Sequence, residues 1–272
     1  MKQDLLAIGD LDRREIEEIL RKAEGFCERR ERDVLRGRVL ASCFFEPSTR
    51  TRLSFETAML RLGGSVMGFS EAGSTSSQKG ESLEDTMRVV GSFADVIVLR
   101  HPEAGSAKRA AEATKTPVIN AGDGANEHPS QTLVDLFTIW KSQGRIDGLR
   151  VAIMGDLKYG RTVHSLVKAL SLYEVNIDFI SSKELALPED LKDILKKKDV
   201  AYSYHERIED VIRDADVVYM TRMQKERLQG ELLKDRYFLK KEMLAGCKKN
   251  MKILHPLPRV DELDKEIDKT PF

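Results

Sequence analysis

The stretch CFFEPSTRTRLSFE places three hydroxyl side chains and an arginine directly after an apolar run, at Ser48, Thr49, Arg50 and Thr51. The residues that follow have the spacing of an amphipathic helix. The first turn of a helix has unpaired backbone N–H groups and the positive end of the helix dipole, which together attract a phosphate. The arginine adds paired donors for phosphate oxygens. The stretch therefore predicts a phosphate site, although an isolated Ser-Thr-Arg could also be a simple helix cap.

Three more polar side chains follow apolar runs in the first half of the chain. Arg100 ends VIVLR, and His128 and Gln131 open HPSQTLVDLF about one helical turn apart. In open α/β sheets, ligands bind at such strand ends. Preorganised donors of this kind can stabilise the oxyanion of a tetrahedral intermediate. A histidine before a proline also often caps a helix or packs in a core, so His128 keeps that alternative.

Two arginines follow apolar runs in the second half of the chain. Arg161 lies in GDLKYGRTVHS after VAIMG, and Arg222 lies with Gln224 in YMTRMQKERL after DADVV. Two separated guanidinium groups suit a small dicarboxylate. The GDLKYG turn lacks the close glycine pair of a dinucleotide loop, so a nicotinamide cofactor is not expected.

Two loops complete the candidates. GSTSSQKGESLEDT carries several hydroxyl groups and a lysine, and the proline turn of ILHPLPRVDE could turn the backbone carbonyls of Pro256 and Leu257 toward a ligand. A lysine would help to neutralise anionic substrates. The first loop could equally be a surface loop before a helix cap at Ser82. Its central hydroxyl groups are those of Ser74, Thr75, Ser76 and Ser77.

The elements that must position these residues alternate along the chain. Short runs rich in Val, Ile and Phe alternate with amphipathic segments, which predicts parallel sheets covered by helices. The expected strands are 39–45, 65–70, 94–100, 117–121, 150–155, 175–181, 199–204, 215–220 and 252–256. The expected helices are Leu11–Arg32, Ser48–Leu62, Ser82–Phe93, Pro129–Lys141, Thr162–Leu172 and Glu206–Asp214. The basic run KKKD is expected to be a solvated helix end.

Nine strands suit two sheets better than one, and a polar, glycine-bearing stretch, SQGRIDGLR, precedes the fresh strand VAIMG. We therefore expect an α/β protein with two doubly wound domains, each a mostly parallel sheet flanked by helices. The boundary is placed near Trp140, giving domains 1–140 and 141–272. The active site is expected in the cleft between them.

Composition excludes several classes of function. Lys plus Arg and Asp plus Glu each number 45, so the net charge is zero and no global field favours nucleic acid or a membrane. The three cysteines show no metal spacing and cannot all pair, which favours a reducing compartment. The sequence has no run of about 18 uncharged apolar residues and no signal-peptide pattern. We predict a cytoplasmic protein with no cofactor and no metal.

The motifs FFEPSTRTRLSFE, VLRHPEAG, AGDGANEHPSQTLVDLFTI, GDLKYGR and HPLP resemble the aspartate/ornithine carbamoyltransferase family. The resemblance runs from Leu40 to Phe272 in the expected order and includes the late DKTP. The first motif implies carbamoyl phosphate as the donor. The Arg222-Met223-Gln224 segment, and an HPLP where ornithine enzymes carry an HCLP-type segment, imply L-aspartate as the acceptor.

The resemblance also implies roles for individual residues. Carbamoyl phosphate is bound by the helix start, by the two loops and by the residues between them: Ser48, Thr49, Arg50, Thr51, Ser76, Lys79, Arg100, His128, Gln131, Pro256 and Leu257. Aspartate is bound by Lys79, Arg161, Arg222, Gln224 and Leu257. The catalytic group consists of Arg50, Thr51, Lys79, Arg100, His128 and Gln131.

The implied mechanism is direct attack of the neutral aspartate amine on the carbamoyl carbon, with phosphate leaving. The departing phosphate is the favoured proton acceptor, and Lys79 is the other candidate. The loop GSTSSQKGESLEDT also resembles the family, in which a serine and a lysine reach into the neighbouring subunit's site; Ser76 and Lys79 match them, which implies a homotrimer with shared active sites. The serine-to-lysine spacing varies within the family, so Ser74, Thr75 or Ser77 could take the place of Ser76. Separate regulatory chains are possible. The alternatives are a carbamoyltransferase with another acceptor, such as ornithine, and a non-catalytic anion-binding or scaffold subunit. The resemblance further implies C-terminal helices beyond Phe272 that this chain lacks.

Overall fold

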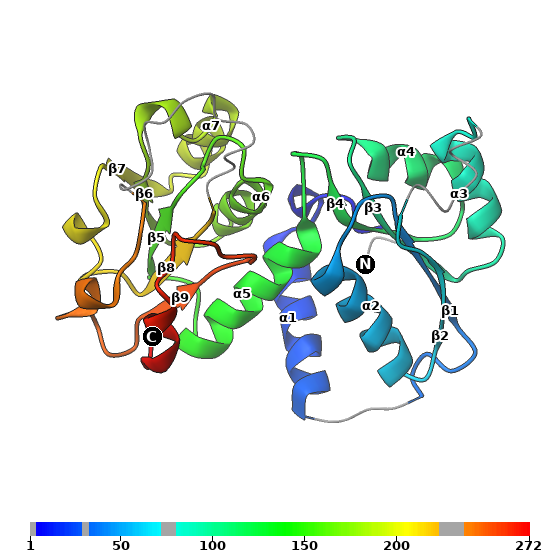
Figure 1. Ribbon diagram of the computed structural model, residues 1–272, viewed down its shortest axis with the longest axis horizontal. Coiled ribbons are helices and arrows are strands. Elements are labelled where there is room, and N and C mark those ends of the chain that lie inside the picture. Colours follow the sequence, from blue (N-terminus) through cyan, green and yellow to red (C-terminus); the bar gives the residue numbers. More distant parts are fainter. Residues whose placement is uncertain (1–3, 29–32, 72–79, 223–236) are drawn as a thin grey trace. The chain divides into compact units, whose positions relative to one another are not determined.

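A computed structural model describes residues 4–28, 33–71, 80–222 and 237–272. The chain divides into two compact units, with the first ending at Leu133 and the second beginning at Val134 (Figure 1). This boundary lies within helix α5 (Pro129–Gln143), which also contains Trp140, where the sequence places it. None of the helices in the described ranges is long and apolar enough to cross a membrane.

The first unit is built on a four-stranded parallel sheet with the order β2-β1-β3-β4. Its strands are β1 (Val39–Phe44), β2 (Ser65–Phe69), β3 (Val96–His101) and β4 (Val118–Asp123). Its helices are α1 (Arg13–Glu28), α2 (Thr49–Arg61), α3 (Leu83–Gly91) and α4 (Ser106–Ala113). Strand β1 reads VLASCF and is buried on both faces, as expected of a central parallel strand.

Alternate residues of β1 pack on opposite faces of this sheet. Ala41 and Cys43 share a core with Met87 of α3 and Ala110 of α4. Leu40 and Phe44 share a core with Met59 of α2. Helices therefore cover both faces, with α3 and α4 on one side and α2 on the other (Figure 1). Burial raises the pKa of the Cys43 thiol to about 12, so this thiol stays protonated.

The second unit is built on a five-stranded parallel sheet with the order β7-β6-β5-β8-β9. Its strands are β5 (Arg150–Met154), β6 (Asn176–Ile180), β7 (Ala201–His205), β8 (Val217–Met220) and β9 (Lys252–Leu254). Helix α6 (Arg161–Leu170) buries an apolar stripe that includes Val163, Leu166 and Leu170. The opposite side carries a core in which Ala152 and Val218 pack with the 3-10 turns and loops that follow the strands.

The two parallel sheets flanked by helices confirm the predicted fold class, and all nine strands lie where the sequence predicts them. Residues 189–197 are not among the predicted helices but form α7 (Glu189–Lys197), and the basic run lies at the end of this helix, as predicted. The helix expected at Glu206–Asp214 is wrong, because this segment forms only a short 3-10 turn at Ile208–Asp210. Its β-branched residues bury their side chains in the core, and β-branched residues favour a helix weakly. Helix α4 is not predicted, because its sequence SAKRAAEA is short and buries only small side chains, those of Ser106, Ala107 and Ala110.

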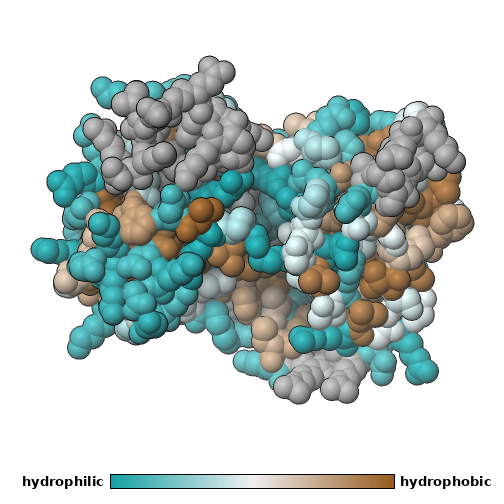
Figure 2. All heavy atoms as spheres, viewed as in Figure 1, coloured by the Kyte–Doolittle hydropathy of each residue, from teal (hydrophilic) through white to brown (hydrophobic). Residues whose placement is uncertain are grey.

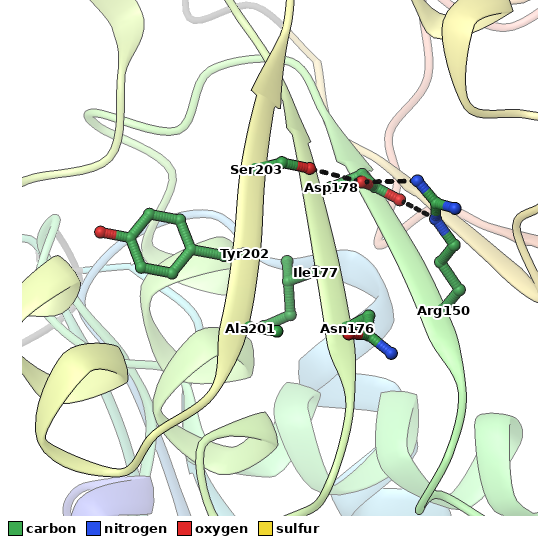
Figure 3. A pocket seen from close by; sticks show the side chains of 7 residues that line it. All are labelled: Arg150, Asn176, Ile177, Asp178, Ala201, Tyr202 and Ser203. Carbon is green, nitrogen blue, oxygen red and sulfur yellow. Dashed lines mark hydrogen bonds and ion pairs between the residues drawn. The ribbon is translucent and has the colours of Figure 1, made fainter.

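A buried carboxylate in the middle of β6 ties three strands of the second sheet together (Figure 3). Asp178 on β6 accepts hydrogen bonds from Arg150 Nε at 2.6 Å, Arg150 Nη2 at 3.2 Å and Ser203 Oγ at 2.7 Å. His205 Nε2 lies 3.1 Å from the same carboxylate. Burial alone would raise the pKa of Asp178, but the hydrogen bonds from Arg150 and Ser203 bring it below its ordinary value. Asp178 therefore stays charged and links β5, β6 and β7.

Replacing Arg150 with methionine keeps most of the side-chain length but removes the charged donors of Asp178. We expect the free energy of unfolding at pH 7 to fall by about 1–2 kcal/mol, toward the lower part of the range because the pair is partly screened by water. Since the pKa of Asp178 is lowered on folding, its contribution is present above the ordinary carboxyl pKa and is lost as the pH falls through the folded-state pKa. Urea unfolding across that pH range measures both effects.

The matched control for this variant is Arg145→Met, because Arg145 is exposed and lies five residues away in the chain. It should change the free energy of unfolding by no more than about 0.5 kcal/mol. Equal losses for the two variants, or a loss for Arg150→Met that does not shrink in acid, would contradict the role given to Asp178.

Candidate active site

The predicted phosphate residues lie at the carboxyl edge of the first sheet. Strands β1 and β3 are neighbours, with Phe44 opposite Arg100, while β2 lies beyond β1 and β4 lies beyond β3. The chain therefore reverses its direction of winding between β1 and β3, and open α/β sheets bind ligands at such a switch point. The start of α2 follows β1, and Arg100 lies near the end of β3, so the structure brings both to this point.

Ser48 occupies the position before the first residue of α2, with extended backbone angles of φ −155° and ψ 103°. Its side chain makes no hydrogen bond to the helix backbone, so Ser48 does not cap α2 through its hydroxyl. Thr49 and Arg50 are exposed, and no ion pair joins Arg50 to another described residue. Arg52, one turn into the helix, lies 3.3 Å from Glu56. The first turn of α2 thus leaves hydroxyl groups and one guanidinium group accessible to an anion.

Arg100 is held by a carboxylate that sequence reasoning does not single out. Its Nε donates to Glu46 Oε1 at 2.7 Å, and the Arg100 side chain is only 15% exposed. The Phe45 N–H donates to the Arg100 carbonyl at 2.9 Å, which aligns the end of β1 with the end of β3. Glu46 directly precedes the Pro-Ser-Thr-Arg motif, and this position was the only signal of its role. It orients one edge of the guanidinium group and leaves the terminal nitrogens for other acceptors.

His128 and Gln131 lie at the start of α5, after β4. The loop before them is fastened by Asp123, which accepts from the Gly105 N–H at 2.9 Å and from the Glu127 N–H at 3.1 Å. The His128 carbonyl accepts from the Gln131 N–H at 3.1 Å, so the residue does contribute to capping the helix through its backbone. Its side chain is buried, at 5% exposure, with Nδ1 3.3 Å from the Ser130 hydroxyl. His128 can therefore cap α5 through its backbone while its imidazole ring is held in a fixed position.

The second sheet also has a switch point, which lies between β5 and β8. Arg161 is the first residue of α6, in the connection after β5, and Arg222 lies two residues beyond β8. Gly155 has φ +128°, and a Cβ placed on it would lie 2.4 Å from the Thr221 carbonyl oxygen. Only glycine permits this close approach of the two backbone segments. The structure therefore brings the connections that carry the two arginines together.

The segment before Arg161 is further held by His164. Its Nε2 lies 3.0 Å from the Leu157 carbonyl oxygen, to which it must donate. Burial lowers the pKa of His164, which favours the neutral ring. The Tyr159 N–H donates to Asp156 Oδ1 at 2.9 Å. These bonds fix the path of GDLKYG and hence the position from which Arg161 projects.

Pro256 and Leu257 follow β9, the neighbour of β8, at the same carboxyl edge of the second sheet. Leu257 is 46% exposed and has φ +59°, a left-handed conformation that is uncommon for leucine. The remaining candidates lie outside the described residues: Ser74, Thr75, Ser76, Ser77, Lys79 and Gln224.

The hollow in Figure 3 is lined by residues at the beginning and middle of β5, β6 and β7, including Asn176 and Ala201. The candidate residues of this unit, in contrast, follow the carboxyl ends of the strands. Across the described ranges, no three His, Cys, Asp or Glu side chains are grouped as they would be to hold a metal ion.

Comparison with known proteins agrees with this arrangement. Residues 3–141 match the family described as "Aspartate/ornithine carbamoyltransferase, carbamoyl-P binding domain", and residues 147–272 match "Aspartate/ornithine carbamoyltransferase, Asp/Orn binding domain". The catalytic subunit of M. jannaschii aspartate transcarbamoylase is similar, with 50% sequence identity and a TM-score of 0.92. That match covers 99% of this chain and 90% of the other.

Aspartate transcarbamoylase from Trypanosoma cruzi is also similar to this chain. Its complex with carbamoyl aspartate and phosphate has 35% identity and a TM-score of 0.91, and its complex with N-(phosphonacetyl)-L-aspartic acid has 35% identity and a TM-score of 0.92. Each match covers 98% of this chain and 88% of the other. Since the two domain families together match nearly every residue, the chain belongs to the aspartate/ornithine carbamoyltransferase family.

Proposed function

We propose that this protein transfers the carbamoyl group of carbamoyl phosphate to the amino group of L-aspartate, giving N-carbamoyl-L-aspartate and phosphate, a step of pyrimidine biosynthesis. The observation that carries the proposal is the pair of arginines, Arg161 and Arg222, that follow the two strands flanking the second switch point. Two guanidinium groups suit a dicarboxylate acceptor and would repel a cationic one such as ornithine. The T. cruzi enzyme with bound carbamoyl phosphate and aspartate is a relative with this pair of substrates.

On the donor side, the start of α2 binds the phosphate through backbone N–H groups, hydroxyls and the Arg50 fork. Arg100, His128 and Thr51 donate to the carbonyl oxygen as it becomes negative in the tetrahedral intermediate. Gln131 and the carbonyls of Pro256 and Leu257 hold the carbamoyl nitrogen. Ser48, Thr49, Ser76 and Lys79 complete the phosphate site.

On the acceptor side, Arg161 and Arg222 bind the aspartate carboxylates, with support from Gln224, Lys79 and the Leu257 backbone. The neutral amine attacks the carbamoyl carbon and the C–O bond to phosphate breaks. The departing phosphate accepts the amine proton, so no covalent enzyme intermediate forms. No cofactor enters this scheme.

The site is completed in a cytoplasmic homotrimer in which Ser76 and Lys79 come from a neighbouring subunit. Support for self-association comes from large apolar side chains that stay exposed in the first unit, among them Phe93 at 63%, Leu60 at 60% and Val89 at 52%. Figure 2 shows apolar surface in brown on the first unit, while the visible face of the second unit is mostly hydrophilic. Surfaces of this kind mark sites of protein association.

The function is tested by supplying carbamoyl phosphate with L-aspartate, with L-ornithine or with no acceptor, and measuring phosphate release together with the carbamoylated product. We expect release that depends on aspartate and proceeds at the background rate with the other two. Ornithine-dependent release would favour the second acceptor class. Equal release in all three reactions would reject carbamoyl transfer and leave an anion-binding subunit.

Replacing Arg50 and Arg222 separately should give different kinetic signatures. Arg50→Ala removes a donor to the phosphate as charge builds up, so kcat should fall about 100- to 1,000-fold. Arg222→Ala removes a guanidinium group that binds an aspartate carboxylate, so KM for aspartate should rise about 10- to 100-fold while KM for carbamoyl phosphate changes little.

The matched control is Arg61→Ala, because Arg61 is exposed in the last turn of the same helix as Arg50. It should leave both kinetic constants within about twofold of the unsubstituted protein. If Arg222→Ala changed kcat alone, or if Arg61→Ala matched Arg50→Ala, the assigned roles would be wrong.

Sharing of the site between subunits is tested by mixing inactive Lys79→Ala chains with inactive Arg50→Ala chains and allowing them to reassemble. Random assortment in a cyclic trimer gives a site with both native residues in about a quarter of cases, so activity should recover to that fraction. Chains reassembled separately serve as controls. Absence of recovery, with trimers present, would place all the residues of a site in one chain.

A further inference from the structure

The loop after β9 is fastened by a buried histidine and glutamate that the proposed mechanism does not use. The side chains of His255 and Glu262 are only 4% and 5% exposed, and His255 Nε2 lies 2.9 Å from Glu262 Oε1. The other ring nitrogen, Nδ1, accepts a hydrogen bond from the Leu257 N–H at 2.8 Å. Both nitrogens of the imidazole are therefore engaged within one short loop.

These two contacts define the protonation state of the His255 ring. A nitrogen that accepts a hydrogen bond must present its lone pair, so Nδ1 carries no proton. Nε2 then carries the proton and donates it to the Glu262 carboxylate. A doubly protonated imidazole could not accept the Leu257 N–H, so this geometry requires the neutral ring.

Glu262 holds the far end of the same loop. Its carboxylate oxygens lie 3.2 Å from the backbone nitrogens of Val260 and Asp261, which donate to it. The pair therefore binds backbone N–H groups on both sides of the exposed turn. Leu257, in the turn that links His255 to Glu262, adopts the left-handed conformation. A leucine keeps this conformation only when its surroundings impose it.

Fixing the Leu257 N–H also fixes a carbonyl. The peptide bond between Pro256 and Leu257 is a single plane, in which the Leu257 N–H and the Pro256 C=O point in opposite directions when the bond is trans. The only cis bond in the described ranges is the next one, between Leu257 and Pro258. When His255 Nδ1 draws the N–H toward itself, the Pro256 carbonyl must point away from the ring.

We propose that His255, supported by Glu262, is a positioning residue that aims the Pro256 carbonyl at the carbamoyl nitrogen of the donor. This inference rests on the proposed function, which gives that carbonyl its partner. A backbone carbonyl has no side chain of its own to orient it, so its direction depends on neighbours that hold the peptide plane. The buried pair supplies that constraint without touching the substrate.

Two substitutions separate the two contacts of His255. In His255→Asn, the amide oxygen lies near the place of Nδ1 and can still accept from the Leu257 N–H, but the contact with Glu262 is lost. In His255→Gln, the longer amide reaches toward Glu262 and can donate to it, but nothing replaces the acceptor at Nδ1. Both variants perturb the same buried site, so their melting temperatures serve as matched controls.

We expect His255→Gln to lower kcat about 10- to 100-fold with a smaller change in KM for aspartate, since a carbonyl displaced by about an ångström no longer aligns the donor. His255→Asn should keep kcat within about threefold, although it loses the bond to a buried carboxylate. A purely structural role predicts the reverse order or equal losses. Either of those outcomes, at comparable melting temperatures, would overturn the proposal.

Amide hydrogen exchange gives a readout that does not require activity. In the unsubstituted full chain, the Leu257 amide should exchange slowly although the residue as a whole is 46% exposed. Exchange at Leu257 should become faster in His255→Gln than in His255→Asn. A rapidly exchanging Leu257 amide in the unsubstituted protein would overturn the proposal even if neither variant folds. Slow exchange without aspartate-dependent turnover would instead mean that the hydrogen bond stands and the proposed reaction fails.

Discussion

Parallel pairing is the constraint from which the candidate site follows. Every strand of both sheets runs parallel to its neighbours, so residues far apart in sequence emerge at a common carboxyl edge. In the first sheet, Phe44 of β1 lies opposite Arg100 of β3, so Arg100 lies near the start of α2, which follows β1. In the second sheet, Met154 of β5 pairs with Met220 of β8, so the connections that carry Arg161 and Arg222 leave the sheet side by side. The side chains carry the chemical groups, and the backbone hydrogen bonds between the strands bring those side chains close together.

Buried polar groups then refine what the sheets bring together. Asp123 holds the loop before His128, Glu46 holds Arg100, and His164 holds the segment before Arg161. Tyr219 on β8 is fully buried and donates to Asp135 of α5 at 2.8 Å, which anchors that helix in the second unit. Leaving such a group without its partner costs about 1–3 kcal/mol, so each bond is a strong local constraint. The candidate site is thus positioned by residues that do not contact a substrate.

Much of the fold and of the candidate site could be predicted from the sequence, for identifiable reasons. Short apolar runs located all nine strands, and the signal was most continuous in the central strands β1, β5 and β8, which are buried on both faces. Amphipathic spacing failed at 206–214, where apolar residues pack around a short turn. Two short helices were also missed: α4, whose buried face consists of small residues, and α7. The placement of Arg100 near a strand end, and of His128, Arg161 and Arg222 in the segments that follow strands, could be predicted from the positions of the motifs.

The supporting residues could not be predicted in the same way. Glu46 and Glu262 are acidic residues of a kind that is usually exposed, and only tertiary packing shows that they pair with Arg100 and His255. The roles of Ser76, Lys79 and Gln224 stay predictions, since these residues lie outside the described ranges.

Gly155 shows how little freedom the acceptor side has. The Thr221 backbone lies so close to Gly155 that not even a methyl group fits between the two residues. The connections after β5 and β8 therefore cannot move closer together to fit a smaller acceptor. Widening the gap for a bulkier one would separate β5 from β8, whose ladder ends only one residue before. Evolution or protein engineering that alters acceptor choice must therefore work by exchanging the side chains that project from this edge, on a backbone that stays as it is.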